Sequence, residues 1–238
     1  RSDLDLLLEL GIPAIKVGSD DFTNIPLLKD YSTTGLPLII SCGMANLEEI
    51  KETLKQINAL NDYPTVLMLT TSEYPTVPMN VNLLKLKTLA NEFPNIILGY
   101  SDHTQGSLAS SLAVALGAKV FEKHFTLDKS LPGPDQSSSL EPLELKKWVE
   151  SVRILEKELG MPKKMVTKSE KQNISMKKMI MIKPGLKGSV IRKENILAMR
   201  TDGKGILPLD KNLKKIIGKK LKKDIYENTN FSWDLIYR

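Results

Sequence analysis

A repeated pairing of a helix with a buried strand is the feature that most constrains how this chain folds. Short apolar runs begin near residues 14, 37, 65, 96 and 119, and the segments between them have the apolar spacing of helices. Continuous apolar strands that alternate with helices are typical of a parallel sheet whose faces are covered by helices. The sequence therefore predicts an α/β fold.

Polar residues at the strand ends distinguish the two architectures that such units can build. Five units suit either an open doubly wound sheet or part of a (β/α)8 barrel. No glycine-rich phosphate-binding motif follows any strand, whereas every strand ends in side chains that can react or bind a ligand. Barrels assemble their sites from several strand ends, so we favour a partial TIM barrel over residues 1–160. Because Arg1 stands inside a helical pattern, we expect these to be the last five units of a longer barrel.

A change in charge and in turn content marks a second part of the chain. Residues 1–162 hold 14 Lys and Arg residues against 21 Asp and Glu residues, whereas residues 163–223 hold 19 against 4. We predict a linker at 161–175 and a small β-rich domain at 176–238. The positive charge leaves a nucleic-acid-binding module as an alternative function. Residues 163–223 contain no aromatic side chain for base stacking, so we expect no nucleic-acid partner.

Composition also bears on where the protein works. No apolar run approaches the roughly 20 residues of a membrane-spanning helix, and no secretory leader is recognisable. The single cysteine, Cys42, excludes an internal disulfide and is expected to be a buried thiol. We expect a cytoplasmic protein with no membrane partner.

The two histidines, His103 and His124, each follow a predicted strand and lie one β/α unit apart. Neighbouring parallel strands are about 4.8 Å apart, so imidazoles at their ends can converge on one ion. Two nitrogens leave several positions open on a divalent metal, which suits substrate activation better than a structural role. The alternative is that each histidine is an ordinary polar group at the barrel rim.

A second group of strand-end residues suits an anionic substrate. A lysine with several hydroxyl groups can hold phosphate or carboxylate oxygens. This group consists of Lys16, Ser19, Ser41 and Ser101. In the loop after the last strand, prolines stiffen the approach to Asp135, whose carboxylate either binds a ligand hydroxyl or belongs to a simple turn.

Six motifs occur in an order and at spacings that resemble the sialic acid synthase family: "KVGSDD", "IISCGM", "TTSEYP", "GYSDHT", "FEKHFT" and "PGPDQSSS". The later segment "IKPGLKGSVIRKENILAMRT" is similar to that family's small antifreeze-like domain, also called the SAF domain. The resemblance implies a transferase that condenses phosphoenolpyruvate with an N-acylated hexosamine, such as N-acetylmannosamine. The products would be a nine-carbon 2-keto sugar acid and phosphate.

The resemblance also implies roles for individual residues. His103 and His124 would hold a divalent metal, manganese or magnesium, and would form the catalytic set with Lys16. Phosphoenolpyruvate would be bound by Lys16, Ser19, Ser41, Ser72 and Ser101, and the sugar by Tyr74, Asp135 and Asp21, the last standing where other members have Glu. Arg200 resembles an arginine that reaches the sugar from a neighbouring subunit, which implies a domain-swapped homodimer of the full-length protein.

Two consequences of the resemblance limit what the chain can do alone. The family's acid/base glutamate and a further phosphate-binding lysine belong to earlier barrel strands, so we expect residues 1–238 by themselves to be inactive. The rival assignment is another phosphoenolpyruvate-condensing barrel that makes seven-carbon or eight-carbon keto acids. Those families lack an SAF domain, which counts against them. The resemblance leaves three candidate sugars: N-acetylmannosamine and the hexosamine precursors of legionaminic acid and pseudaminic acid.

Overall fold

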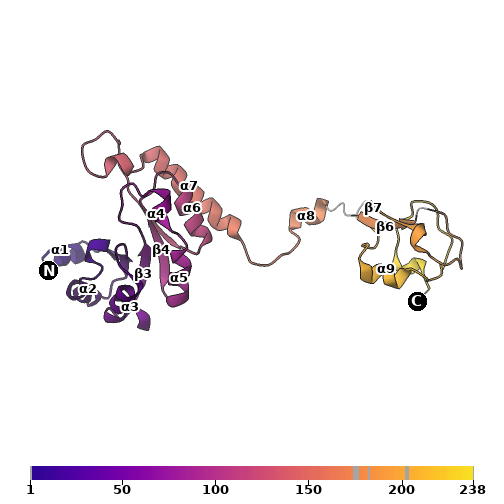
Figure 1. Cartoon of the computed structure of the whole chain (residues 1–238), viewed down its shortest axis with the longest axis horizontal. Coiled ribbons are helices and arrows are strands. Elements are labelled where there is room, and N and C mark those ends of the chain that lie inside the picture. Colours follow the sequence, from indigo (N-terminus) through magenta and orange to yellow (C-terminus); the bar gives the residue numbers. More distant parts are fainter. Residues whose placement is uncertain (1, 174–176, 182, 202–203, 238) are drawn as a thin grey trace. The chain divides into compact units, whose positions relative to one another are not determined.

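The computed structural model describes residues 2–173, 177–181, 183–201 and 204–237. The chain divides into two compact units (Figure 1), Arg1–Met161 and Pro162–Arg238. Each unit has its own core. The first unit contains the predicted β/α repeats.

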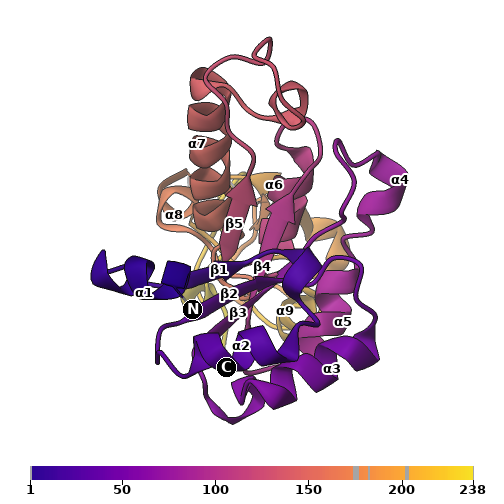
Figure 2. The same ribbon diagram turned by 90° about the vertical axis from the view of Figure 1, so that its left-hand side faces the viewer.

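Five parallel strands form the sheet of the first unit: β1 (Ile15–Val17), β2 (Leu38–Ser41), β3 (Thr65–Leu69), β4 (Ile97–Asp102) and β5 (Val120–Lys123). They lie side by side in chain order, without the reversal of order that defines a doubly wound sheet. The sheet curls as it proceeds from β1 to β5 (Figure 2). The first unit is therefore a curled half-barrel, consistent with the partial TIM barrel that the strand ends indicated.

Helices cover the outer face of this sheet. Five of them lie between consecutive strands in the chain, whereas the first precedes β1 and the last follows β5. They are α1 (Ser2–Glu9), α2 (Ile25–Ser32), α3 (Leu47–Gln56), α4 (Pro78–Val81), α5 (Lys85–Glu92), α6 (Leu108–Ala115) and α7 (Pro142–Leu159). The start of α3 is set by a capping box, in which Asn46 accepts from the backbone N–H of Glu49 and Glu49 accepts from that of Asn46. The long helix α7 ends before Gly160, which has φ of +54°.

The core of the first unit lies between the sheet and these helices. Along β2, Leu38 and Ile40 face the helices and are fully buried, and Leu67 continues the same layer on β3. Side chains alternate across a strand, so the residues between them face the opposite side, toward the inside of the half-barrel. This alternation determines which polar residues reach the candidate site.

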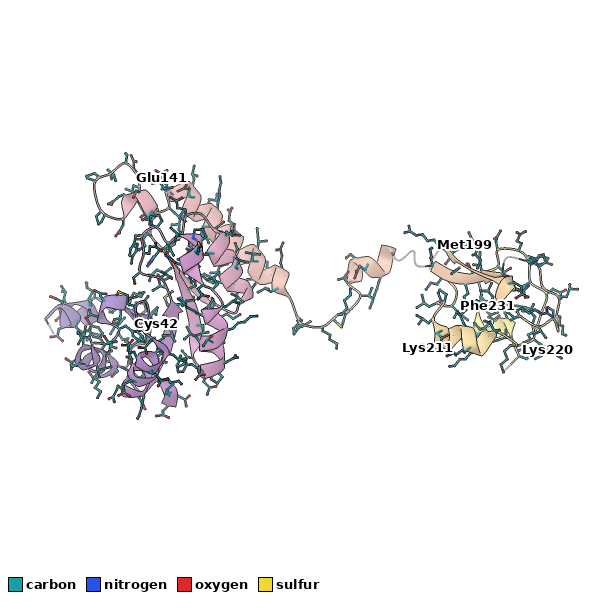
Figure 3. The ribbon with its side chains drawn as sticks, viewed as in Figure 1. Cys42, Glu141, Met199, Lys211, Lys220 and Phe231 are labelled. Atoms are coloured by element: carbon teal, nitrogen blue, oxygen red, sulfur yellow. The ribbon has the colours of Figure 1, made fainter. Side chains whose placement is uncertain are left out.

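The second unit contains the antiparallel pair β6 (Lys177–Met181) and β7 (Ile196–Arg200), with helix α9 (Asp210–Ile216). Further strand-like pairing consists of isolated bridges such as Val190 with Lys220. The buried Phe231 belongs to its core (Figure 3). The prediction of a β-rich domain missed α9, whose sequence "DKNLKKI" is short and dominated by lysine.

The segment predicted as a linker, 161–175, contains the short helix α8 (Lys168–Asn173). Its start is stabilised by Thr167 and Glu170, because each side chain accepts from the backbone N–H of the other residue. The predicted boundary between residues 175 and 176 lies outside the described residues. Across the described ranges, no helix combines the length and the apolar character needed to cross a membrane.

Candidate functional site

The candidate site lies at the C-terminal ends of the strands of the first unit, on the face turned away from the helices. On β4 and just beyond it, Ser101 and His103 share this inner face, while Asp102 between them points to the helices. The same alternation on β5 places Glu122 and His124 on the inner face. Its intervening residue, Lys123, is buried with Asp102 on the helix side.

A hydrogen-bonded network joins the inner-face residues of four strands. The Nζ atom of Lys16 on β1 donates to Ser41 Oγ on β2 at 2.9 Å and lies 3.3 Å from Glu122 Oε2 on β5. Ser101 on β4 donates its hydroxyl proton to Glu122 Oε1 at 2.8 Å. The structure thus brings together three of the residues expected to hold an anion, and adds a carboxylate among them.

His103 has a defined tautomer. Its Nδ1 atom lies 2.8 Å from the carbonyl oxygen of Thr71, which can only accept, so Nδ1 carries the proton and Nε2 keeps a free lone pair. Ser101 Oγ lies 3.4 Å from Nε2, but its proton is donated to Glu122. Burial lowers the pKa of His103, so the neutral imidazole is favoured.

His124 faces His103 and completes a cluster of three rings with Tyr74. The ring centres of the two histidines are 5.1 Å apart, and that of Tyr74 lies 4.1 Å from His103 and 5.2 Å from His124. Asp135, from the loop after β5, approaches His124 with 3.7 Å between Oδ2 and Nδ1. Burial, followed by the charges of Asp135 and Glu122, raises the pKa of Tyr74.

Ser19 and Ser72 converge on Gly43, just after β2. The Gly43 N–H donates to Ser19 Oγ at 3.0 Å. A Cβ atom at Gly43 would lie 2.6 Å from Ser72 Oγ and 2.7 Å from Ser19 Oγ. Only a glycine leaves room for both hydroxyl groups at this corner of the site.

One predicted residue of the first unit, Asp21, is not brought into this network. Asp21 accepts a hydrogen bond from Asn24 at 2.9 Å, within its own turn. Its neighbour Asp20, rather than Asp21, is among the carboxylates whose charge raises the pKa of Tyr74. Arg200 ends β7 and belongs to the second unit.

The donor set fits a divalent metal that retains open coordination positions. His103 offers a free Nε2 lone pair, and His124 lies beside it. Within the described residues, no group of three or more His, Cys, Asp or Glu side chains could hold a metal. Two imidazoles would provide part of a coordination shell and leave the remainder to water or substrate.

Sequence reasoning missed Glu122, although the signal was present. In "FEKHF" the period-2 alternation of a strand places Glu122 and His124 on one face and Phe121 and Lys123 on the other. Phe121 contacts Trp148 of α7 at 6.4 Å between ring centres, which identifies the helix side. By contrast, Cys42, labelled in Figure 3, is buried as expected, and burial raises the pKa of its thiol to about 12.

Comparison with known proteins identifies relatives of this chain. The model of the NeuB family matches residues 1–164. The chain is 40% identical to the N,N'-diacetyllegionaminic acid synthase of Legionella pneumophila, with 99% of this chain and 67% of that protein covered. It is 36% identical to the human N-acetylneuraminate-9-phosphate synthase, with 98% of this chain and 65% of that protein covered.

A solved structure extends the similarity to three dimensions. The N-acetylneuraminic acid synthetase of Leptospira borgpetersenii, determined in complex with citrate, superimposes with a TM-score of 0.66 at 36% identity. The match covers 71% of this chain and 59% of that one. The chain thus spans about two thirds of the length of its curated relatives. On the family match and these identities, the chain belongs to the NeuB family of enzymes.

Proposed function

We propose that this protein is a nonulosonic acid synthase, which condenses phosphoenolpyruvate with an N-acylated hexosamine. The observation that carries the proposal is the convergence of Lys16, Ser41, Ser101 and Glu122 beside the two histidines. A cation and hydroxyl groups suit an anionic substrate, and the adjoining rings and Asp135 suit a hydroxylated one. Family membership favours this reaction over those that make seven-carbon or eight-carbon keto acids.

In the proposed reaction, C3 of phosphoenolpyruvate attacks the aldehyde carbon of the open-chain sugar and forms the new C–C bond. Water adds to the former enol carbon, C2, and the C–O bond to phosphate breaks, which yields the 2-keto acid and inorganic phosphate. A divalent metal bound by His103 and His124 would polarise the aldehyde oxygen as a Lewis acid. We assign this metal as manganese or magnesium.

The chain's own residues would bind and orient the two substrates. Lys16, with the hydroxyl groups of Ser19, Ser41, Ser72 and Ser101, would hold the oxygens of phosphoenolpyruvate. Glu122 would determine where the Lys16 ammonium and the Ser101 hydroxyl lie, since it contacts both. Tyr74 and Asp135 would contact the sugar next to His124. Such positioning lowers the barrier by holding reactants in a reactive geometry.

For the second unit we propose the role of the SAF domain, with Arg200 contacting the sugar of the partner subunit in a domain-swapped homodimer. We also propose that Asp21 binds the sugar, with the substrate replacing the hydrogen bond that Asp21 accepts from Asn24. The family resemblance of "IKPGLKGSVIRKENILAMRT" supports the assignment.

The test is an assay of the full-length protein with phosphoenolpyruvate, Mn²⁺ and three hexosamines in turn. These are N-acetylmannosamine and the hexosamine precursors of legionaminic acid and pseudaminic acid. We expect phosphate release that depends on one of the three sugars, with a product whose mass equals that of the condensed nine-carbon acid. Phosphate release that is independent of any hexosamine would contradict the proposal.

A further inference from the structure

Two charged side chains are buried on the helix side of the sheet, directly before the two histidines. Asp102 precedes His103 and Lys123 precedes His124. Lys123 Nζ lies 3.2 Å from Asp102 Oδ1, and the side chains are 1% and 0% exposed. Asp102 and Lys123 are also the last register pair of the β4–β5 ladder. Both histidines therefore lie just beyond the point where regular strand pairing ends.

The ion pair holds the backbone directly after His103. Asp102 Oδ1 accepts from the backbone N–H and from the hydroxyl of Thr104, each at 2.8 Å. Lys123 Nζ donates to the carbonyl oxygen of Thr104. An ammonium from β5 and a carboxylate from β4 thus hold the same residue, which follows His103.

The helices support this arrangement from outside. Ser110 on α6 donates its hydroxyl proton to Asp102 Oδ2. Trp148 Nε1 on α7 donates to Ser110 Oγ at 2.9 Å. A continuous chain of hydrogen bonds therefore runs from α7 through α6 to the ends of β4 and β5.

Stability alone does not account for charges at this position. Taking two charges out of water costs free energy that their attraction often fails to recover, and apolar residues of similar volume commonly do as well. An ion pair adds orientation, because its hydrogen bonds fix which atoms are in contact and at what distance. Such fixed geometry matters most where two side chains must coordinate one metal ion.

We propose that Asp102 and Lys123 are positioning residues that fix the separation and orientation of His103 and His124. This inference rests on the proposed function, in which the two imidazoles hold a divalent metal. The hydrogen bonds that the pair makes to Thr104 and its place in the strand register carry this effect to the two imidazoles. Groups outside the first coordination shell commonly change metal affinity by about 10-fold to 100-fold.

The experiment measures Co²⁺ binding to the full-length protein, by calorimetry and by the visible absorption of bound Co²⁺, whose intensity reports coordination geometry. The variant is Asp102→Asn combined with Lys123→Met, which removes both charges and keeps an oxygen that accepts from Thr104. We expect its Co²⁺ dissociation constant to rise about tenfold or more, with a changed absorption intensity.

Leu54→Ala provides the control for a general loss of stability. Leu54 is fully buried on α3, in the hydrophobic core of the first unit, and α3 lies between β2 and β3 in the chain. We expect this variant to melt at a lower temperature than the wild-type protein, yet to bind Co²⁺ with unchanged affinity and absorption. A loss of Co²⁺ affinity in Leu54→Ala equal to that in the charge variant would overturn the inference.

A second variant keeps the inference testable if the charge variant fails to fold. Ser110→Ala combined with Trp148→Phe removes both the donor and the acceptor of the hydrogen bond between α6 and α7. Neither the indole N–H nor the serine hydroxyl is then left buried without the other. We expect Co²⁺ affinity to fall about fivefold. Wild-type affinity in every variant that folds would overturn the inference. A wild-type protein that binds no Co²⁺ would instead overturn the proposed metal site itself.

Discussion

The ammonium of Lys16 lies 3.3 Å from the carboxylate of Glu122, although β1 and β5 are the first and last strands of the sheet. In a flat sheet, strands spaced by about 4.8 Å would place β1 and β5 roughly 19 Å apart. The contact therefore requires a curled sheet, with both side chains on its inner face. It also joins the outermost strands directly across the candidate site.

Glu122→Gln should impair catalysis more than folding. The amide can still accept from Ser101 but no longer pairs with the Lys16 charge. We expect kcat/KM for phosphoenolpyruvate to fall about tenfold. The unfolding free energy should change by less than about 1 kcal/mol, since both groups are more than a third exposed. Steady-state kinetics and thermal melting measure the two effects. Glu48→Gln, which alters an exposed pair with Lys51, is the matched control, and equal kinetics in the two variants would refute the role of Glu122.

His103→Ala and His124→Ala should each abolish metal-stimulated condensation. Each removes one of the two imidazoles that would hold the metal, and both side chains lie at strand ends rather than in the apolar core. Metal content after dialysis and turnover at increasing Mn²⁺ are the measurements, with circular dichroism to confirm the fold. The assignment fails if both variants keep normal stimulation by Mn²⁺.

Gly43→Ala should weaken phosphoenolpyruvate binding. The added methyl group would lie 2.6 Å from Ser72 Oγ and 2.7 Å from Ser19 Oγ, so these hydroxyl groups must move. We expect a destabilisation of about 1–3 kcal/mol, as for other overpacked sites. Titration calorimetry with phosphoenolpyruvate should show a weaker dissociation constant.

Gly18→Ala is the comparison for that variant. Its added methyl group would meet the Asp20 carboxylate, the end of a side chain that can swing away. We expect a smaller loss of both stability and binding than at Gly43. Similar losses of stability and of phosphoenolpyruvate binding at the two positions would contradict the importance of the space at Gly43 for the Ser19 and Ser72 hydroxyl groups.

Cys42 should make the protein less stable at alkaline pH. Burial raises the pKa of its thiol from 9.0 to about 12. Above pH 9 the unfolded chain loses this proton while the folded protein keeps it, so stability falls as pH rises from 9 toward 12. The slope attributable to Cys42 approaches about 1.4 kcal/mol per pH unit at most. Urea unfolding at several pH values, compared with Cys42→Ala, measures it. Parallel pH profiles for the two proteins would contradict this prediction.

The strands and the location of the site could be predicted from the sequence because both depend on local patterns. Apolar runs place β1 to β5, and the polar residue at each strand end marks the edge where the site forms. The pairing of Lys16 with Glu122 could not be predicted this way, because it depends on the curl of the whole sheet. Asp21 could not be placed by its motif for a different reason. Its position in the motif implies sugar binding, but in the structure it accepts a local hydrogen bond from Asn24 instead.

The helices that the sequence analysis missed have a similar explanation. The start of α8 carries a recognisable Thr-x-x-Glu capping signal at Thr167 and Glu170, which the polar composition of the segment obscured. In α9, Ile216 is fully buried in the second core, so tertiary packing rather than apolar periodicity supports the helix. The roles expected of the site residues came from the family resemblance, whereas Glu122 was recognised only from its contacts in the structure.

The alternation in "SDHT" and "FEKHF" has a consequence for how this protein can change. A single-residue insertion or deletion within β4 or β5 would exchange the two faces of that strand. The imidazole would then enter the helix layer, and a buried charge would be turned toward the substrates. The lengths of these two strands should therefore tolerate no variation of one residue, whereas the loop at 127–139 can change in length without inverting either strand. Single-residue insertions, scanned along residues 97–139, should prevent correct folding at the two strands and should again be tolerated in that loop.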